Sequence, residues 1–295
     1  MKRAILLTLS LLFLFCFVSC GAEETQSTPD TSSLPEETAS EPSEASEVIE
    51  SSEESIEPET VEVLFIGNSF TYYNELSSIF ENIAQSAGVN VHTTEVSIGS
   101  ARLDWFYDPA QAVSRSVTTA LESTTFDFVF LQEHSTRPNK EYASFTKAVG
   151  ELCTRIRGTS PDANIYLYET WGFAEDNSSL TGSGMTTKEQ EVLLIEAYEK
   201  AGTECALPVS YAGIAHYRVY KETALDPYGN DRKHPSYAGS FAAALTHFYT
   251  LFPEIEKEAV TFAGELSEED LAALRDIAYA VAHDDDPKSV LEEAA

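Results

Sequence analysis

The sequence predicts an α/β fold with three layers, α/β/α, built around a mainly parallel sheet of five strands. From residue 61 onward, short runs rich in β-branched and aromatic residues alternate with longer amphipathic segments. Strands that alternate with helices form right-handed βαβ units, which make a parallel sheet covered on both faces. Residues 61–295 are numerous enough to bury one core of their own, so a single domain is sufficient.

Each predicted element follows from its local pattern. The strands are short apolar runs at 61–66, 89–96, 126–132, 164–169 and 205–211. The helices have apolar residues at spacings of three and four, at 74–87, 109–121, 140–157, 187–201, 236–251 and 267–282. The last helix opens at Ser267 with a capping-box pattern. In such sheets ligands bind beyond the carboxyl ends of the strands, so residues that directly follow each strand are the candidates for a site.

Small and polar residues follow the first three predicted strands. Ser69 lies on the turn between the first strand and a helix, where a serine can expose its hydroxyl and its backbone amide. Gly99 follows the second strand, where glycine permits a tight turn and lets an amide approach a ligand. Gln132 ends the third strand at the head of a polar cluster. Taken singly, each is also ordinary turn chemistry.

Asp231 and His234 lie just before the helix predicted from residue 236. A carboxylate three residues before a histidine can accept a hydrogen bond from Nδ1, which leaves Nε2 to take a proton from a serine hydroxyl. An exposed polar turn, with Ser236 capping the next helix, is the alternative for this segment alone. Combined with Ser69, the pattern predicts a Ser-His-Asp triad.

Several stretches of the sequence resemble the SGNH (GDSL-like) hydrolase superfamily, and more narrowly a branch of exported bacterial proteins. They are Phe65–Phe70, Gly99, Leu131–Ser135, Tyr168–Gly172 and Asp231–Gly239, and the resemblance covers about residues 61–283. It implies a flavodoxin-like fold, Ser69 as nucleophile, Asp231 and His234 as its partners, and the amides of Ser69 and Gly99 as oxyanion donors. The third sequence motif of the superfamily is usually Gly-x-Asn-Asp, whose asparagine side chain is another oxyanion donor, and this motif is absent here. The resemblance implies that Gln132, at the matching strand end, takes this role, as in the sialate-acetylesterase-like relatives.

The first 20 residues are typical of a secretory signal. They begin with two basic residues and continue with an apolar run shorter than the roughly 18 to 20 residues that span a bilayer. Residues 17–20 resemble the bacterial lipobox, which implies a lipid on Cys20 and a lipoprotein of the cell membrane that faces outward. Cleavage at an ordinary small-residue site, with Cys20 incidental, is the alternative.

Residues 21–60 contain 13 acidic residues and no basic one. Together with many Ser, Thr and Pro residues, this composition cannot bury enough apolar surface to offset the entropy lost on ordering. We expect a disordered linker, with an acidic interaction tail as the alternative. The whole chain has a formal charge of −31, which excludes nucleic acid as a partner because phosphate binding requires basic residues.

Other residues that could carry chemistry have weaker patterns. His134, His216 and the acidic run 284–286 lack a recognised metal-ligand spacing, so we expect neither a metal nor another cofactor. Cys153 and Cys205 could pair outside the cytosol or remain two thiols, and the sequence does not decide between these.

These observations predict a surface-anchored, SGNH-type serine esterase that removes small acyl groups from carbohydrate. Tyr72, Trp105 and Trp171 lie near strand ends and could form a platform for a sugar ring, with packing in the core as the alternative. The polar connection 171–185 is expected to shape the cleft. A lipid or lysophospholipid esterase and a non-catalytic glycan-binding lipoprotein stay open. The expected partners are a small-molecule or glycan ester and, through Cys20 alone, the membrane.

Overall fold

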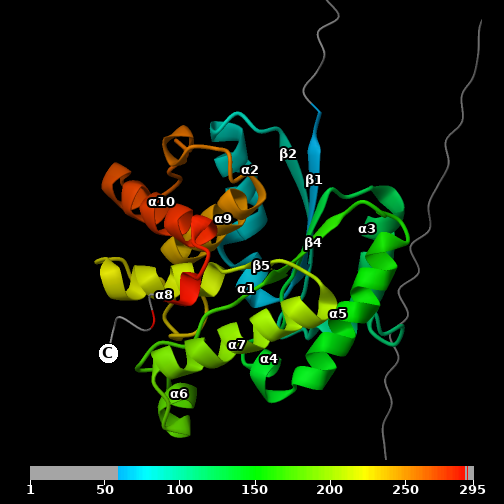
Figure 1. Ribbon diagram of the computed structural model, residues 1–295, viewed down its shortest axis with the longest axis horizontal. Helices are drawn as coiled ribbons and strands as arrows, with labels where there is room; N and C mark the ends of the chain where they lie inside the picture. Colours follow the sequence, from blue (N-terminus) through cyan, green and yellow to red (C-terminus); the bar gives the residue numbers. More distant parts are fainter. Residues whose placement is uncertain (1–58, 290, 292–295) are drawn as a thin grey trace, which may run out of the picture. The chain divides into compact units, whose positions relative to one another are not determined.

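The computed structural model describes residues 59–289 and residue 291. A five-stranded, entirely parallel sheet lies between two layers of helices, as the sequence predicts (Figure 1). The signal, the lipid site at Cys20 and the linker up to residue 58 lie outside the described residues. Within the described ranges, no helix is both long enough and apolar enough to cross a membrane.

The sheet brings the carboxyl ends of its strands to one edge. The strands are β1 (Val61–Gly67), β2 (Val91–Ser97), β3 (Phe128–Leu131), β4 (Asn164–Tyr168) and β5 (Val209–Ser210), in the order β2-β1-β3-β4-β5. Ile66 of β1 is in register with Val96 of β2 and with Leu131 of β3. The segments that follow these three strands therefore begin side by side, at the point where the strand order reverses and ligands bind in such sheets.

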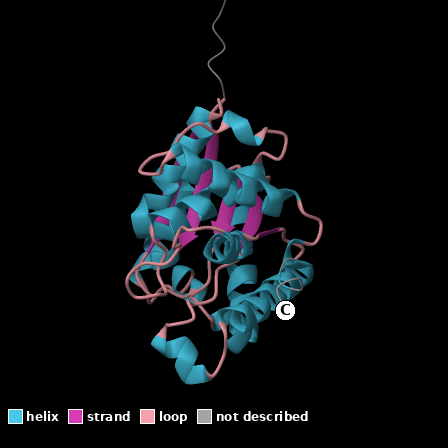
Figure 2. Cartoon of the chain, turned by 90° about the vertical axis from the view of Figure 1, so that its left-hand side faces the viewer, coloured by secondary structure: helices cyan, strands magenta, loops and turns pink. Residues whose placement is uncertain are grey.

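Helices and 3-10 turns connect the strands and cover the sheet (Figure 2). The helices are α1 (Ser69–Tyr72), α2 (Leu76–Ser86), α3 (Ala112–Ser123), α4 (Arg137–Lys140), α5 (Tyr142–Arg157), α6 (Ser178–Ser183), α7 (Thr187–Cys205), α8 (Ala212–Glu222), α9 (Tyr237–Leu251) and α10 (Glu268–His283). The 3-10 turns are η1 (Tyr73–Glu75), η2 (Leu103–Phe106), η3 (Lys257–Ala259) and η4 (Pro287–Ser289). α2, α8, α9 and α10 supply the core on one face, and α3 and α5 supply the core on the other. α7 contributes to both cores, Ile195 to the first and Tyr198 to the second.

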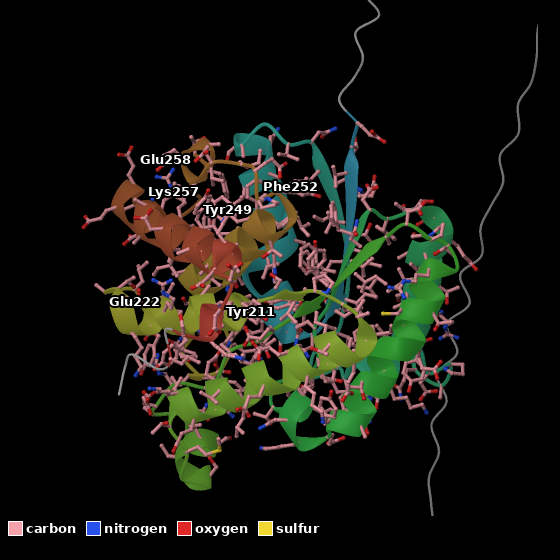
Figure 3. All side chains as sticks on the ribbon, in the orientation of Figure 1. Tyr211, Glu222, Tyr249, Phe252, Lys257 and Glu258 are labelled. Carbon is pink, nitrogen blue, oxygen red and sulfur yellow. The ribbon has the colours of Figure 1, made fainter. Side chains whose placement is uncertain are left out.

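Alternate residues of β1 enter the two cores. Phe65 packs on the α9 face, where its ring stacks on Phe130 of β3 at 5.0 Å, whereas Leu64 and Ile66 enter the opposite core. Nearly every residue of α9 is buried, because this helix contacts α2, α8 and α10. At the end of α9, Phe252 contacts Phe128 with ring centroids 6.0 Å apart, and the Tyr249 hydroxyl donates to the Lys257 carbonyl at 3.0 Å (Figure 3).

The structure corrects the sequence prediction at the fifth strand. Residues 205–211 were expected to form it, but α7 continues through Cys205 and closes at Ala206, whose φ of 53° is left-handed. Pro208 has no N–H for a sheet hydrogen bond, so only Val209 and Ser210 pair with β4. The helix α8 that follows was not predicted.

Two helix starts also differ from expectation. The Ser267 hydroxyl does cap α10 by accepting from the Asp270 amide at 3.1 Å. The Asp270 carboxylate, however, accepts from the Ser267 hydroxyl rather than from the Ser267 backbone amide. The reciprocal capping box is found instead on α7, between Thr186 and Glu189.

Candidate active site

A tight turn places Ser69 at the first position of α1, directly beyond β1. Asn68 caps the helix by accepting from the Phe70 amide at 3.1 Å. A Cβ on Gly67 would lie 2.2 Å from the Thr71 hydroxyl, so only glycine allows the helix to start this close to the strand. Ser69 itself is 8% exposed, at the carboxyl edge of the sheet.

Ser69, His234 and Asp231 are joined by two hydrogen bonds, although 165 positions separate the serine from the histidine. His234 Nε2 lies 2.8 Å from Ser69 Oγ, and His234 Nδ1 lies 2.5 Å from Asp231 Oδ2. The amides of Lys233 and His234 donate to Asp231 Oδ1 at 3.1 and 2.9 Å. With Nδ1–H donating to the carboxylate, Nε2 is the ring atom free to accept the serine proton.

The electrostatics of Asp231 keep it ionised. Burial acts to raise its pKa, but the hydrogen bonds from the amide and the imidazole of His234 and from the amide of Lys233 outweigh burial. The pKa of Asp231 therefore lies below the usual value for an aspartate. At neutral pH the residue is an acceptor for the imidazole N–H.

Three donors from the segment after β4 hold the backbone of residues 231–233. The indole N–H of Trp171 donates to carbonyl 233 at 3.0 Å, the Ala174 amide to carbonyl 232 at 3.1 Å, and the Asn177 side chain to carbonyl 231 at 3.1 Å. The connection 171–185 therefore supports the histidine turn, a role that local sequence patterns did not reveal.

Trp171 was expected in a platform for a sugar, and this prediction is wrong. Its side chain is only 1% exposed, stacked between Phe70 at 4.5 Å and His216 at 4.3 Å. His216 in turn donates from Nε2 to the Pro227 carbonyl at 3.0 Å, and burial lowers its pKa to about 3, so it is neutral. These rings form a rigid floor beneath the triad.

Gln132 has a structural position rather than the expected place as an oxyanion donor. Its side chain is fully buried, and Oε1 accepts from the Asn68 amide at 2.8 Å and from the Thr71 hydroxyl at 3.1 Å. Nε2 donates to the carbonyl of Glu133. Gln132 therefore fills the space left by Gly67 and fixes the Ser69 turn to the end of β3.

A buried ion-pair cluster follows Gln132. Glu133 accepts from the amides of Leu103 and His134 at 3.2 and 2.6 Å, and from Arg137 at 2.9 Å. Burial raises the pKa of Glu133, although these hydrogen bonds and the Arg137 charge act against it. Arg137 also binds Asp104 at 2.8 Å, so the cluster anchors η2 beside β3.

The backbone amides of Ser69 and Gly99 are free to bind an oxygen atom. Neither donates to a group in the part of the chain that the structure describes. The Gly99 loop is held against the Ser69 turn because Ile98 N donates to the Gly67 carbonyl at 3.3 Å and Asn68 Nδ2 donates to the Ala101 carbonyl at 3.0 Å. The loop itself is exposed at Gly99.

An exposed apolar wall, Tyr72, Tyr73 and Ile98, adjoins the triad. Of the four large hydrophobic residues exposed among residues 59–289 and 291, these are three, at 37%, 37% and 44%. The Tyr73 ring lies flat on the His234 ring, with centroids 4.4 Å apart and an interplanar angle of 6°. Trp105, the other expected platform residue, is partly buried and lies 5.9 Å from the Arg102 guanidinium.

A buried carboxyl pair, Glu169 and Glu191, lies under the turn at Gly172. Glu191 accepts from the Gly172 amide at 2.5 Å, and Glu169 accepts from the Gly213 and Ile214 amides at 2.7 and 3.2 Å. Burial, and for Glu169 also the neighbouring carboxyl, raises the pKa of both side chains. The two therefore share a proton near neutral pH.

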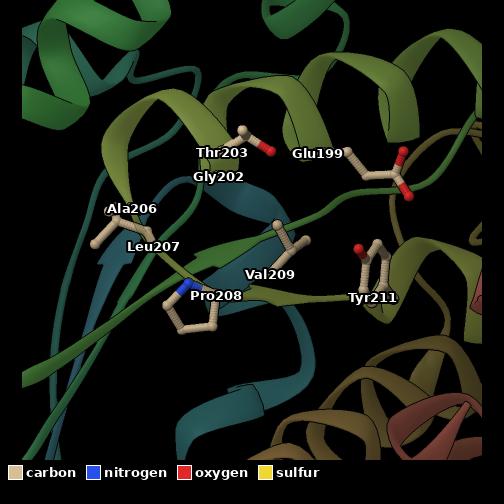
Figure 4. A pocket seen from close by; sticks show the side chains of 8 residues that line it. All are labelled: Glu199, Gly202, Thr203, Ala206, Leu207, Pro208, Val209 and Tyr211. Carbon is tan, nitrogen blue, oxygen red and sulfur yellow. The ribbon is translucent and has the colours of Figure 1, made fainter. Parts of the chain in front are cut away.

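Other candidate groups lie apart from the triad. Cys153 and Cys205 are free thiols that line one hollow of about 600 Å³ between α5 and α7. Another hollow of about 600 Å³ lies between α7 and β5, and shares no lining residue with the triad (Figure 4). Among the described residues, no group of three or more His, Cys, Asp or Glu side chains could hold a metal ion.

Comparisons with known proteins agree with this architecture. No protein-family model and no curated protein matches the sequence. A protein from Slackia heliotrinireducens assigned to the SGNH hydrolases is 25% identical, with a TM-score of 0.56 over 65% of this chain and 100% of its own. A DUF4886 family protein from Bacteroides uniformis is 18% identical, with a TM-score of 0.65 over 76% of this chain and 95% of its own. A protein from Parabacteroides merdae assigned to the GDSL-like lipases is 12% identical, with a TM-score of 0.52 over 68% and 98%. The chain therefore has the SGNH hydrolase fold. The likeness to the Slackia protein supports the superfamily that the sequence motifs indicate.

Proposed function

We propose that the protein is a serine ester hydrolase that acts through Ser69, His234 and Asp231. The observation that carries this proposal is the pair of hydrogen bonds, 2.8 Å and 2.5 Å, that connects the serine through the imidazole to the carboxylate. The SGNH fold supports it, as does the likeness to the Slackia protein.

The chemistry follows from the geometry. Ser69 Oγ attacks the ester carbonyl carbon while its proton moves to His234 Nε2, and Asp231 stabilises the resulting imidazolium. The carbonyl oxygen becomes an oxyanion, which the amides of Ser69 and Gly99 bind. His234 then donates the proton to the leaving alcohol as the C–O bond breaks. Water, activated by the same imidazole, hydrolyses the acyl-enzyme and restores Ser69.

We infer that the substrate is an acylated carbohydrate with a small acyl group. The exposed apolar wall supports this inference, because tyrosine rings pack well against the faces of sugar rings. The same wall is the one feature that also favours a lipid ester. A series of nitrophenyl esters of increasing acyl length, beside acetylated sugars, separates the two, since a sugar deacetylase should prefer the shortest chain.

We also propose that the domain is tethered outside the cell by a lipid on Cys20. The support is the signal-like sequence of residues 1–20 and the acidic composition of residues 21–60. Mass spectrometry of the mature N-terminus tests this proposal. An unmodified Cys20, or cleavage beyond it, would exclude the anchor.

Covalent labelling tests the enzymatic proposal directly. A fluorophosphonate probe should label the domain at Ser69, and Ser69→Ala and His234→Ala should abolish labelling, because a serine hydroxyl is a weak nucleophile without its base. Ser78→Ala, which alters an exposed serine on α2, is the matched control and should label normally. No labelling and no turnover, with retention of a glycan on an array, would favour a non-catalytic binding protein.

A further inference from the structure

Two basic residues, Arg102 and Lys233, belong to the two loops that support the triad. Lys233 directly precedes His234, whose Nε2 bonds to Ser69. Arg102 directly follows Ala101, whose carbonyl accepts from the side chain of the residue before Ser69. Each cation is therefore one position away from a residue that contacts the nucleophile or its neighbour.

The charges of both residues also act on His134, which lies beyond the end of β3. Burial, and next the charges of Lys233, Arg137 and Arg102, lower the pKa of His134. The charges of Arg102 and Lys233, which come from two different loops, therefore act on the same ring. His134 is partly exposed and neutral at pH 7, so it adds hydrogen-bonding capacity but no charge.

The neighbouring carboxylates leave these cations largely uncompensated. Glu133 and Asp104 are both bound by Arg137, whose side chain is 4% exposed. Arg102 has only a 3.4 Å contact to Asp104, with 42% of its side chain exposed. Lys233 forms no ion pair with any residue that the structure describes, and its ammonium lies 5.9 Å from the Phe173 ring.

Other acidic groups near the triad already have hydrogen-bond or ion-pair partners. Asp231 binds His234, while Asp176 and Asp226 both bind Arg232 at 2.7 and 2.5 Å. The whole chain has 49 acidic and 18 basic residues, so two basic side chains without a close carboxylate partner contrast with the rest of the molecule. Positive charge of this kind attracts and orients an anionic ligand.

We propose that Arg102 and Lys233 bind an anionic group of the substrate, so that the preferred substrate is an ester that carries a carboxylate. Together with the apolar wall, this points to an acylated acidic carbohydrate. The inference rests on the proposed esterase function, because it assigns the substrate class of the same site.

A pair of esters matched in all but charge tests this inference. The carboxylate ester 4-acetoxybenzoate and its neutral methyl ester transfer the same acetyl group from similar phenols. The measured quantity is the ratio of kcat/KM for the charged ester to that for the neutral one. Lys233→Gln and, independently, Arg102→Gln should each lower this ratio about tenfold, the effect of losing one charge-assisted hydrogen bond at a partly exposed site. Added salt should lower the wild-type ratio as well.

A second pair locates the anion on the substrate. The 4-nitrophenyl monoester of succinic acid and 4-nitrophenyl butyrate differ by a carboxylate on the acyl side. If the lysine and arginine variants change this ratio rather than the first, the anion belongs to the acyl group instead of the sugar, and the acidic-carbohydrate assignment is overturned.

The matched control is Lys147→Gln, which removes the same charge from an exposed site on α5 and should leave both ratios unchanged. Equal ratios in the wild type, Lys233→Gln, Arg102→Gln and Lys147→Gln would overturn the anion site while leaving the esterase function standing. Failure of the wild type to hydrolyse any of these esters, together with no fluorophosphonate labelling, would instead overturn the esterase function and this inference with it.

Discussion

Replacing Asp231 with asparagine should move the proton of the neutral His234 ring from Nδ1 to Nε2. In the structure, one carboxylate oxygen of Asp231 accepts hydrogen bonds from two backbone amides, and the other accepts a hydrogen bond from His234 Nδ1. An asparagine has one oxygen, and this atom can keep the two amide hydrogen bonds. Its NH₂ group then faces Nδ1, which must give up its proton in order to accept. The proton moves to Nε2, where it faces Ser69 and blocks general-base catalysis.

The expected loss in kcat is roughly 10⁴, which corresponds to about 5.5 kcal/mol on the barrier. Asp231→Ala should lower kcat less than Asp231→Asn does. The Asp231 side chain is 52% exposed, so water can take the place of the carboxylate and accept from Nδ1–H. The order of activity is therefore wild type, then Asp231→Ala, then Asp231→Asn.

Steady-state hydrolysis of a nitrophenyl acetate and the rate of fluorophosphonate labelling measure this order. Asp226→Asn is the control, because Asp226 is an exposed carboxylate near the same turn that binds Arg232 instead of His234. Thermal denaturation verifies that each variant is folded. An Asp231→Asn enzyme within tenfold of the wild type, or more active than Asp231→Ala, would refute the reasoning about the tautomer.

Two further predictions concern stability. Gly67→Ala places a Cβ 2.2 Å from the Thr71 hydroxyl and should lower the free energy of unfolding by about 1 to 3 kcal/mol, so an unchanged melting temperature would contradict it. The raised pKa values of Glu169 and Glu191 mean that the folded state holds protons that the unfolded chain releases, so their stabilisation is complete below about pH 4.5 and is lost as pH rises. Glu169→Gln removes one of these protons but keeps a donor toward Glu191, so its free energy of unfolding should fall less steeply between pH 5 and 7, by up to about 1.4 kcal/mol per pH unit. Parallel denaturation profiles for the wild type and this variant would rule out a shared proton.

The triad residues could be found from the sequence because the place of Ser69 after a strand and the spacing of Asp231 and His234 before a helix are both local properties. Exposure is not a local property, so Trp171, an aromatic residue near a strand end, was mistaken for a binding residue. Gln132 was misassigned for a similar reason. Its hydrogen-bond partners lie 61 and 64 positions away in the sequence, so the residues next to Gln132 do not reveal them.

The helix α8 was missed because its cap comes from a distant part of the chain. The residue before the helix, Tyr211, makes no side-chain capping bond. The Glu169 carboxyl, 44 and 45 positions earlier, accepts from the Gly213 and Ile214 amides instead. Rules that look for a serine or aspartate just before a helix cannot detect such a cap.

The three hydrogen bonds from the segment 171–177 hold carbonyl oxygens of residues 231–233, not their side chains. The turn that carries His234 is thus held through carbonyl groups that every amino acid possesses. The side chain at 233 can change without removing any of these hydrogen bonds, and the exposed side chains of Tyr72 and Ile98 can change without removing a contact to His234. Substrate preference in this scaffold can therefore be redesigned, or altered by natural divergence, one surface position at a time while hydrolysis itself is retained.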